Sequence, residues 1–446
     1  MNEREAPHHV AIIGGGPAGL FAARELAERH IHSVIFNRDI KPGGLAEYGI
    51  YPTKLKMKEG LRNQFRQILA RNEIEYYGNI LVGDHGDISL DDLRALGFDA
   101  LLVTVGAQST KRLGIPGEEL SGVYHAKDIV YHYNLLPPYS ENVYSIGMRV
   151  AVIGVGNVMV DVAHWLIDEK GVEKVIAIAR RGPADVKFDR KELEEVIGCL
   201  DIGMLVDELD RVAPVVLKIG QDPTALLNVV REVALKMPNE VCNSSLSLRF
   251  LSTPVGILGN ENGSVKGLQV EENRLVLTDD GLTRPVGTGN LVTLDVDTVI
   301  YAIGDEVDAA MGLPVLYGEF DKNPQPRFPV DGVSYELFDP QTNQPIPDIF
   351  LAGWARKPSV GLVGIARKDA VNSIQAVSRY LETIPTTTIP VSARVRERMF
   401  QIGKPVIDKQ ALQRLENLEK DRAKDLNVAS FKFASNEEML QVLDLV

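Results

Sequence analysis

Two glycine-rich turns carry the clearest chemical signal in the sequence. The first, Gly14–Gly19, reads GGGPAG between the apolar run VAII and the amphipathic run LFAARELAERH. In a strand–turn–helix context Gly14 permits the tight turn, Gly16 lets the backbone approach a pyrophosphate, and Gly19 allows the helix to pack close to the strand. The helix N-terminus then presents N–H groups and a dipole that favour anions. This pattern predicts a dinucleotide-binding turn.

The second turn, Gly154–Met159, follows the apolar run VAVI and precedes another amphipathic run. Met159 occupies the third glycine position, so we expect its helix to lie farther from its strand, as in a more open NAD(P) site. The next apolar run, VIAIAR, ends at Arg180 and Arg181, where an NAD site has an acidic residue. Arginines there suit a ribose 2′-phosphate through bidentate, charge-assisted bonds, which favours NADP over NAD. The alternative is a solvated basic pair at a strand end.

The end of the strand after the first turn departs from the usual pattern. About 20 residues after such a motif, an acid commonly holds the ribose hydroxyls, whereas here the run SVIF is followed by Asn37. An amide accepts hydrogen bonds but lacks the charged, bidentate character of a carboxylate. We therefore expect Asn37 to contact the cofactor with a weaker grip than an acid would have.

Strand-like runs place these residues in two domains. Leu101–Ala107 and Asp297–Glu306 are apolar runs that reach a glycine, and they bracket the second turn, so the second domain is predicted to be inserted into the first. The predicted class is α/β, with two Rossmann-like dinucleotide-binding domains, one of them discontinuous. The predicted bounds are residues 1–108 and 306–446 for the discontinuous domain and 109–305 for the insert. The charged tail from Val391 is expected to be helical and to pack on the first domain or on a partner.

Composition excludes several function classes. The chain has 446 residues, enough for two or three domains, and a formal net charge of −13, which opposes nonspecific binding to nucleic acid or to an anionic membrane. Cys199 and Cys242 are too few for an iron–sulfur cluster and too far apart for a CxxC pair, and we expect both to be reduced and structural. The eight histidines show no metal-ligand spacing. Because no signal region or run of about 18 apolar residues occurs, the expected location is the cytoplasm.

Ten segments resemble one known family, the NADPH–ferredoxin reductases of the adrenodoxin reductase type, which are related to the small subunit of glutamate synthase. They run in order over nearly the full length: GGGPAG, PGGLAEYGI, YYGNILVGDH, LLVTVGAQS, LGIPGEEL, GVGNVMVDVA, ARRGPADVKFDRKEL, RFLSTP, GWARKPSVGLVG and ARKDA. Glutamate synthase small subunits have a cysteine-rich N-terminal extension, whereas this chain starts directly at the first strand. That difference favours the adrenodoxin reductase branch.

The resemblance implies FAD in the discontinuous domain and NADPH in the inserted one. The motifs and the resemblance together predict two sets of contacts. For FAD they are Gly14, Gly16, Pro17, Ala18, Gly19, Asn37, Gly44, Leu45, Val82, Gly106, Trp354, Gly361, Leu362 and Val363. For NADPH they are Gly154, Gly156, Asn157, Val158, Arg180, Arg181 and Glu192, with Gly361 near the nicotinamide.

Three residues are candidates for a direct part in catalysis. Trp354 stands where related flavoproteins often have an acid after a glycine, and the resemblance implies that its indole packs against the flavin arm and lines the floor of the nicotinamide site. A plain core tryptophan is the alternative. Gly361 is expected at the flavin edge. Lys54 falls where fast members of the family often have a histidine, so a proton relay at that point would be altered.

The implied function is FAD-dependent transfer of hydride from NADPH and delivery of electrons to a ferredoxin-like iron–sulfur or flavin carrier. A basic run in a predicted helix could meet an acidic carrier or form a solvated helix face. It contains Lys54, Lys56, Lys58, Arg62 and Arg66. Two further hypotheses are an electron-input subunit of a larger, glutamate synthase-like complex and a non-catalytic flavin-binding redox sensor.

Overall fold

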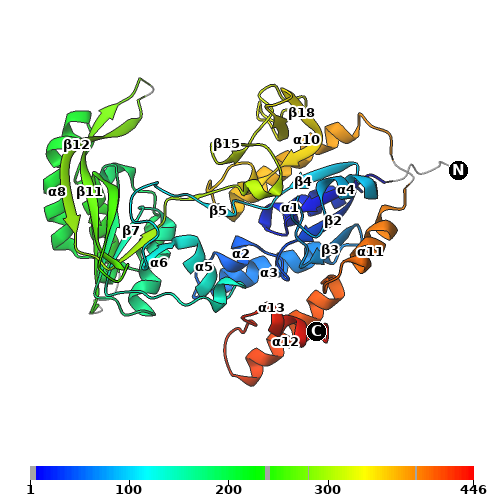
Figure 1. The fold of residues 1–446 in the computed structure, drawn as a ribbon, viewed down its shortest axis with the longest axis horizontal. Helices are drawn as coiled ribbons and strands as arrows, with labels where there is room; N and C mark the ends of the chain where they lie inside the picture. The colour runs from blue at the N-terminus through cyan, green and yellow to red at the C-terminus, as the bar shows by residue number, and fades with distance from the viewer. Residues whose placement is uncertain (1–6, 237–241, 280, 387–388) are drawn as a thin grey trace. The chain divides into compact units, whose positions relative to one another are not determined.

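The computed structural model describes residues 7–236, 242–279, 281–386 and 389–446 (Figure 1). The chain divides into two compact units. Unit 1 consists of Met1–Thr110, Tyr131–Glu141 and Gly304–Val446, and unit 2 consists of Lys111–Val130 and Asn142–Ile303. Each unit has its own parallel sheet, which confirms the predicted α/β class with two Rossmann-like folds, one interrupting the other.

Unit 1 is built on a six-stranded sheet in the order β17-β18-β4-β1-β2-β3, in which only the edge strand β17 is antiparallel to its neighbour. The chain runs from β1 through β2 to β3 on one side and then crosses to β4 on the other side of β1. This reversal creates a switch point between the carboxyl ends of β1 and β4, where such sheets bind ligands. The strands are β1 (His9–Ile13), β2 (His32–Asn37), β3 (Ile74–Gly78), β4 (Ala100–Val103), β17 (Glu336–Asp339) and β18 (Gln344–Leu351).

Helices cover both faces of this sheet, because its strands are apolar on both sides. Val10 and Ile12 face a core shared with α1, α3, α10 and α12, while Ala11 and Ile13 face a core shared with α4 and α11. These helices are α1 (Pro17–Glu28), α3 (Leu55–Leu69), α4 (Leu90–Leu96), α10 (Val363–Leu381), α11 (Val391–Gln401) and α12 (Lys409–Asp425).

Unit 2 contains a five-stranded parallel sheet in the order β6-β13-β7-β8-β9, with its switch point between β13 and β7. A three-stranded antiparallel sheet, β10-β11-β12, packs on it through one apolar core. The strands are β6 (Val123–His125), β7 (Arg149–Ile153), β8 (Lys174–Ile178), β9 (Ser245–Arg249), β10 (Ser252–Gly259), β11 (Val265–Leu277), β12 (Thr283–Leu294) and β13 (Thr298–Tyr301). The helices are α6 (Asn157–Asp168), α7 (Arg190–Leu193), α8 (Ile202–Val216) and α9 (Ala225–Ala234).

Short elements complete the chain. They are α2 (Leu45–Tyr48), α5 (Ala126–Tyr133), α13 (Asn436–Gln441), β5 (Ser109–Thr110), β14 (Asp305–Glu306), β15 (Val315–Leu316) and β16 (Glu319–Phe320). Among the described residues, none of the helices has the length and apolar character that crossing a membrane requires.

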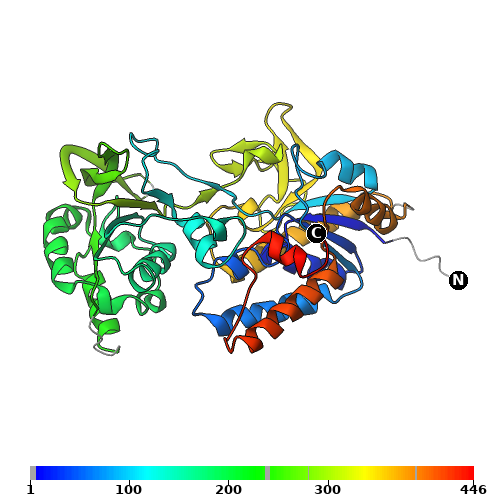
Figure 2. The ribbon, with the colours of Figure 1, turned by 60° about the horizontal axis from the view of Figure 1, so that its bottom comes forward.

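The C-terminal tail is helical, as predicted, and packs on unit 1. Figure 2 shows α12 beside α3, and Arg66 Nε of α3 lies 2.7 Å from Glu416 Oε2 of α12. At the start of α12, Lys409 Nζ donates to the carbonyl oxygens of Arg71 and Ile74. Of the two predicted arrangements, the structure has the one in which the tail covers the first domain.

The two cysteines form a disulfide in unit 2, with their Cα atoms 5.1 Å apart. The prediction of two reduced thiols is therefore wrong. It considered sequence spacing, whereas the fold brings the segments together, since Leu200 and Leu246 form a bridge beside the two cysteines. Cys199 precedes Leu200 directly, and Cys242 lies just before β9.

Candidate functional site

The first glycine turn connects β1 to α1 at the switch point of the unit 1 sheet. Gly14 has φ +112°, and its N–H donates to the carbonyl oxygen of Phe36 at 2.8 Å. A Cβ added to Gly19 would lie 2.1 Å from the Gly14 carbonyl oxygen and 2.7 Å from Thr104 Oγ1. Gly16 precedes α1, which no side chain caps. An uncapped helix N-terminus with closely approaching backbone is the arrangement that accepts a pyrophosphate.

A second tight turn, at Gly43 and Gly44, packs against the first. The Gly43 N–H donates to the carbonyl oxygen of Gly15 at 2.7 Å. Gly44 has φ +48°, and a Cβ there would lie 3.1 Å from the Gly16 Cα. Leu45, which begins α2 directly after Gly44, is half-buried. The structure thus brings the predicted residues Gly14, Gly16, Gly44 and Leu45 to one place.

Asn37 holds the glycine turn from the end of β2. Its Oδ1 accepts a hydrogen bond from the Gly15 N–H at 2.8 Å, and its Nδ2 donates to the carbonyl oxygens of Asp39 and Lys41. Only 7% of the residue is exposed. The amide is therefore engaged in shaping the turn, and a contact between Asn37 and a ribose stays a prediction.

Trp354 fixes a second loop of unit 1. Its indole Nε1 donates to the carbonyl oxygens of Val360 and Gly361 at 3.1 and 3.2 Å. Gly361 has φ +75°, and a Cβ there would collide with Ile365. Val360, Leu362 and Ile365 are all more than half exposed. Because Trp354 is half-buried and bonded to a loop with exposed apolar side chains, this surface is suited to a flat ring.

The second glycine turn repeats the first in unit 2 with a looser third position. The Gly154 N–H donates to the carbonyl oxygen of Ile178 at 2.9 Å, and a Cβ on Gly154 would lie 2.3 Å from the carbonyl oxygen of Ala302. No atom of the described residues would lie within 4 Å of a Cβ on Gly156. Met159 is 1% exposed, so the larger residue is accommodated in the interior of unit 2. Val158 beside it is 43% exposed.

Side chains beyond the second turn hold its open edge. Asn157 and Asp189 are paired reciprocally, since Asn157 Nδ2 donates to Asp189 Oδ2 and the Asp189 N–H donates to Asn157 Oδ1. At the end of β8, Arg180 is exposed, while Arg181 Nη1 lies 3.7 Å from Asp185 Oδ1. Among the described residues, the buried Nε of Arg181 has no hydrogen-bond partner.

These features fit two dinucleotides. In unit 1, Gly16 begins α1 with backbone N–H groups that no described side chain caps and with no side chain of its own, which suits a pyrophosphate. In unit 2, the unpartnered Arg181 Nε is a donor that a phosphate oxygen would satisfy. The residues present therefore match the chemistry of FAD and NADP.

Comparison with known proteins agrees with this fit. A family model of pyridine nucleotide-disulphide oxidoreductases matches residues 8–197. The NADPH-ferredoxin reductase FprA of Mycobacterium leprae (strain TN) is 28% identical over 407 residues, 84% of each chain. The mitochondrial NADPH:adrenodoxin oxidoreductase of Arabidopsis thaliana is 28% identical over 408 residues, 84% of this chain and 83% of the relative. The chain is thus similar to these two NADPH reductases over most of its length.

A solved structure supports the fold over nearly the whole length of the chain. Mycobacterium tuberculosis FprA in complex with NADPH matches with a TM-score of 0.82, covering 98% of this chain and 100% of that chain at 24% identity. This match confirms the predicted fold, and the two NADPH reductases above confirm the resemblance that the ten segments indicated.

The remaining predicted contact residues lie in different parts of the two units. Val82 is 7% exposed in the core below β1 and β2, and Gly106, with φ +75°, lies in the loop after β4. Lys54 is the residue before α3, where its backbone N–H donates to the carbonyl oxygen of Tyr51. Glu192 lies in α7, half-buried. Their contacts with cofactors and the proton relay at Lys54 stay predictions.

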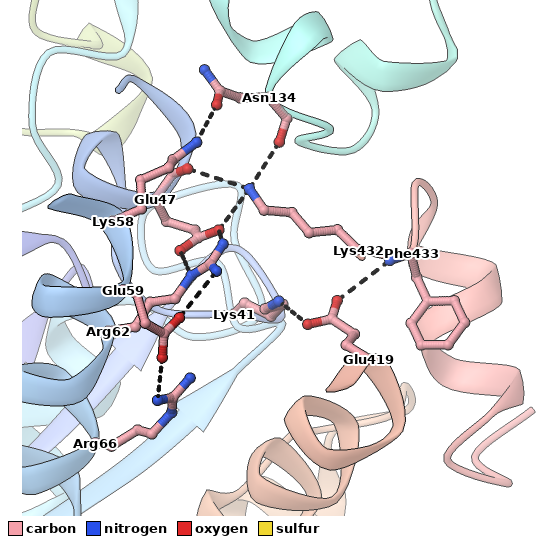
Figure 3. Close-up of polar contacts among 10 residues, drawn as sticks. All are labelled: Lys41, Glu47, Lys58, Glu59, Arg62, Arg66, Asn134, Glu419, Lys432 and Phe433. Carbon is pink, nitrogen blue, oxygen red and sulfur yellow. Dashed lines mark hydrogen bonds and ion pairs between the residues drawn. The ribbon is translucent and has the colours of Figure 1, made fainter. Parts of the chain in front are cut away.

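Most of the predicted docking face on α3 is buried or paired within unit 1. Lys58 is 3% exposed, and its Nζ donates to Asn134 Oδ1 at 2.5 Å (Figure 3). Burial, with the charge of Lys432 adding to it, lowers the pKa of Lys58 to about 7. The prediction that Lys58 belongs to an exposed basic face is therefore wrong.

The two arginines of that face are paired with acids. Arg62 forms a bidentate pair with Glu47 of α2, with Nε–Oε2 and Nη2–Oε1 distances of 2.7 and 2.6 Å, and Arg66 contacts Glu59 (Figure 3). Arg66 also contacts Glu416 of α12. Burial opposes ionisation of Glu47, but the bonds from Arg62 and the charge of Lys432 outweigh it and lower the pKa of Glu47. Lys56 is exposed and stays a candidate contact for a partner.

Sequence reasoning missed one acid beside the site. Asp369 lies in α10, within the segment ARKDA, and its carboxylate accepts a hydrogen bond from the Gly353 N–H at 2.7 Å. A signal was present, because Asp369 precedes the buried Ala370 on the face of α10 that also contributes Ser373 and Ile374 to the core. A carboxylate at the edge of such a face needs a partner.

Proposed function

We propose that this chain is an FAD-dependent oxidoreductase that takes hydride from NADPH and passes electrons to a ferredoxin-like iron–sulfur or flavin carrier. One observation carries the proposal. The same strand–turn–helix device occurs twice, each time at the switch point of a parallel sheet, and the second is followed by Arg180 and Arg181. Two such turns in one chain suit transfer between two dinucleotides. The names of the relatives, both NADPH reductases, support the same reading.

The two cofactors are assigned by the differences between the turns. FAD is proposed for residues 1–108 and 306–446, which include the tightly packed turn, and NADPH for residues 109–305, which include the open one. Within unit 1, segment 131–141 also belongs to the body that contains the FAD turn.

The residues of the chain act by positioning. Bound FAD supplies the change from two-electron to one-electron chemistry. The backbone at Gly16 and Gly44 approaches the pyrophosphate, and the indole of Trp354 holds the Gly361 turn that borders the ring. Arg180 and Arg181 select the 2′-phosphate. Correct orientation of the two rings, with water excluded, is the main source of rate in such a transfer.

The proposed partner is an acidic carrier, which Lys54 and Lys56 could contact at the start of α3. A cytoplasmic location is part of the proposal. Because cytosolic thiols are usually kept reduced, the disulfide between Cys199 and Cys242 makes their redox state in cells the test: reduced thiols support the cytoplasm, and an intact disulfide contradicts it.

The deciding experiment is anaerobic stopped-flow reduction of the purified protein by NADPH and by NADH, read at the flavin absorbance. We expect rapid bleaching by NADPH, slower bleaching by NADH, and re-oxidation by a ferredoxin. Bound flavin that neither nucleotide bleaches would instead identify a redox sensor. Bleaching without electron delivery to ferredoxins, together with a co-purifying large subunit, would identify an electron-input subunit.

A further inference from the structure

The Asp369 carboxylate joins three parts of unit 1. Its Oδ2 accepts from the Gly353 N–H at 2.7 Å, at the end of β18. Both carboxylate oxygens accept from Arg356 Nε at 3.1 Å, and Oδ1 also accepts from Arg356 Nη2. The hydroxyl of Tyr335 lies 3.4 Å from Oδ1. One side chain of α10 thus holds the strand end and the short helical turn that follows it.

The ion pair between Asp369 and Arg356 is enclosed. The two side chains are 10% and 7% exposed, and the Arg356 guanidinium lies over the buried Tyr335 ring, 4.6 Å from its centroid. Burying two charges costs solvation that their attraction barely repays, so such a pair is a poor source of stability by itself. Its value lies in the geometry that it imposes.

The ion pair also affects the contact between the end of β18 and helix α1. Gly353 has φ +66°, and a Cβ there would lie 2.7 Å from the Ala18 Cβ in the first turn of α1. The hydrogen bond from Gly353 to Asp369 therefore holds the end of β18 against the start of α1. Ala18 follows Gly16 and Pro17, so this contact lies beside the proposed pyrophosphate position.

The same geometry reaches the loop at Gly361 through Trp354. Trp354 directly follows Gly353, and its indole bonds to the carbonyl oxygens of Val360 and Gly361. A shift of the Gly353 peptide would move the indole and with it the loop. Asp369 is tied to both ends of this segment, since α10 begins two residues after Gly361.

We propose that Asp369 and Arg356 are positioning residues that set the segment 353–361 for the flavin and the nicotinamide. The inference rests on the proposed function for its effect on catalysis. Position 354 has an indole in place of an acid. The carboxylate of this region is instead that of Asp369, which accepts a hydrogen bond from the backbone N–H of Gly353.

The test compares Asp369→Asn with Asp348→Asn. Asn is nearly isosteric with Asp and can still accept from Gly353, but it leaves Arg356 without a counter-charge. Asp348 is the matched control, because it lies on the same strand, β18, and forms a bidentate pair with Arg94 at 2.6 and 2.9 Å. Each variant removes one charge from an ion pair, and only the first touches segment 353–361.

We expect Asp369→Asn to slow flavin reduction by NADPH at least tenfold and to change the visible circular dichroism of the bound flavin. Asp348→Asn should reduce the flavin at the wild-type rate. The double variant Arg356→Gln/Asp369→Asn removes both charges. If it recovers thermal stability but stays slow, positioning and stability are separated. If Asp369→Asn matches Asp348→Asn in rate and spectrum, or if the double variant regains the wild-type rate, the proposal is overturned.

A readout without cofactors keeps this outcome separate from the proposed function. The chain has only two tryptophans, so in a Trp165→Phe background the fluorescence and near-ultraviolet circular dichroism report Trp354 alone. We expect Asp369→Asn, and not Asp348→Asn, to shift both signals. Identical Trp354 signals in the two variants would refute the positioning role even if wild-type protein is not reduced by NADPH. Failure of NADPH to reduce the wild type would refute the proposed function alone.

Discussion

The two glycine turns share a scheme and differ at one position. Gly14 and Gly154 both have positive φ, +112° and +129°, and both donate their N–H to the last or next-to-last residue of the neighbouring strand. At the third position, Gly19 leaves no space even for a methyl group, whereas the second turn has a fully buried Met159 there. The same local turn therefore accommodates residues of very different size at its third position.

The surroundings of the two turns also differ, because the first turn is enclosed and the second is open. The first is enclosed, with Asn37 bonded to Gly15 and the Gly43–Gly44 turn against Gly16. The second is open at Gly156, and its edge is held by the exposed pair of Asn157 and Asp189. An enclosed turn suits a cofactor that stays bound, and an open turn suits one that exchanges at every turnover.

The largest expected effect is a loss of stability in unit 2 alone, which distinguishes the two units that contain the turns. Replacing Cys199 and Cys242 by Ser removes a cross-link that closes a 43-residue separation in unit 2, which the chain-entropy model values at about 4 kcal/mol. Urea unfolding followed by far-ultraviolet circular dichroism and by flavin fluorescence should show an earlier transition for unit 2 and an unchanged release of FAD. Equal midpoints with and without the cysteines would contradict the disulfide.

The next effect tests the third glycine position of the first turn. In Gly19→Ala the new Cβ would meet the Gly14 carbonyl oxygen at 2.1 Å, and a main-chain atom cannot rotate away, so we expect a loss of about 3 kcal/mol and of bound FAD. Gly156→Ala, at the second glycine position of the other turn, is the control, because Gly156 has φ −112° and no described atom lies near the added Cβ. Its free energy of unfolding should stay within about 0.5 kcal/mol of wild type. Thermal unfolding and the ratio of FAD to protein measure both.

Local signals made both turns predictable, since each glycine's role depends on residues within a few positions. Strand ends were predictable for the same reason, and Asn37 was placed correctly at the end of β2. The disulfide was not predictable, because the two cysteines meet only after the sheet of unit 2 has formed. Asp369 and Gly353 likewise come together only when α10 packs behind β18.

The fate of the basic run on α3 shows the same limit. Its charges predicted a face for a partner, but Lys58, Asn134 and Lys432 come from three distant parts of the sequence and meet in the interior of unit 1 (Figure 3). Helical spacing shows which residues share a face. It does not show what the rest of the chain places over that face.

A smaller effect sharpens the assignment of the second turn to NADP. Charge-assisted hydrogen bonds contribute about 2 kcal/mol, so Arg180→Gln/Arg181→Gln should raise the KM for NADPH roughly 30-fold. The KM for NADH should not change, because NADH lacks the 2′-phosphate. Arg190→Gln, which removes an exposed arginine paired with Glu232 in the same unit, is the control. Steady-state kinetics with both nucleotides decides, and an equal loss for NADPH and NADH would contradict the assignment.

The smallest effect is a pH dependence confined to the unit that contains the enclosed turn. Lys58 faces Glu47, Arg62 and Lys432, and its pKa in the folded protein is about 7 because burial disfavours the ammonium form. In the unfolded chain a lysine has a pKa of about 10.4. Between these values the unfolded state binds more protons, so the free energy of unfolding rises with pH, by about 1 kcal/mol from pH 7 to pH 8.

Replacing Lys58 by Met isolates this contribution. The stabilisation is fully present above the unfolded pKa and is lost as the pH falls through about 7, so the wild-type curve should climb relative to that of Lys58→Met across this window. Lys432, whose pKa burial lowers to about 8, is present in both proteins and adds a similar slope to each. Lys56→Met changes an exposed lysine on the same helix and should run parallel to wild type. Urea unfolding at intervals between pH 6.5 and 9 (about the titration window) compares the three proteins. Parallel curves for wild type and Lys58→Met would place the ammonium of Lys58 in contact with water and would remove this distinction between the two units.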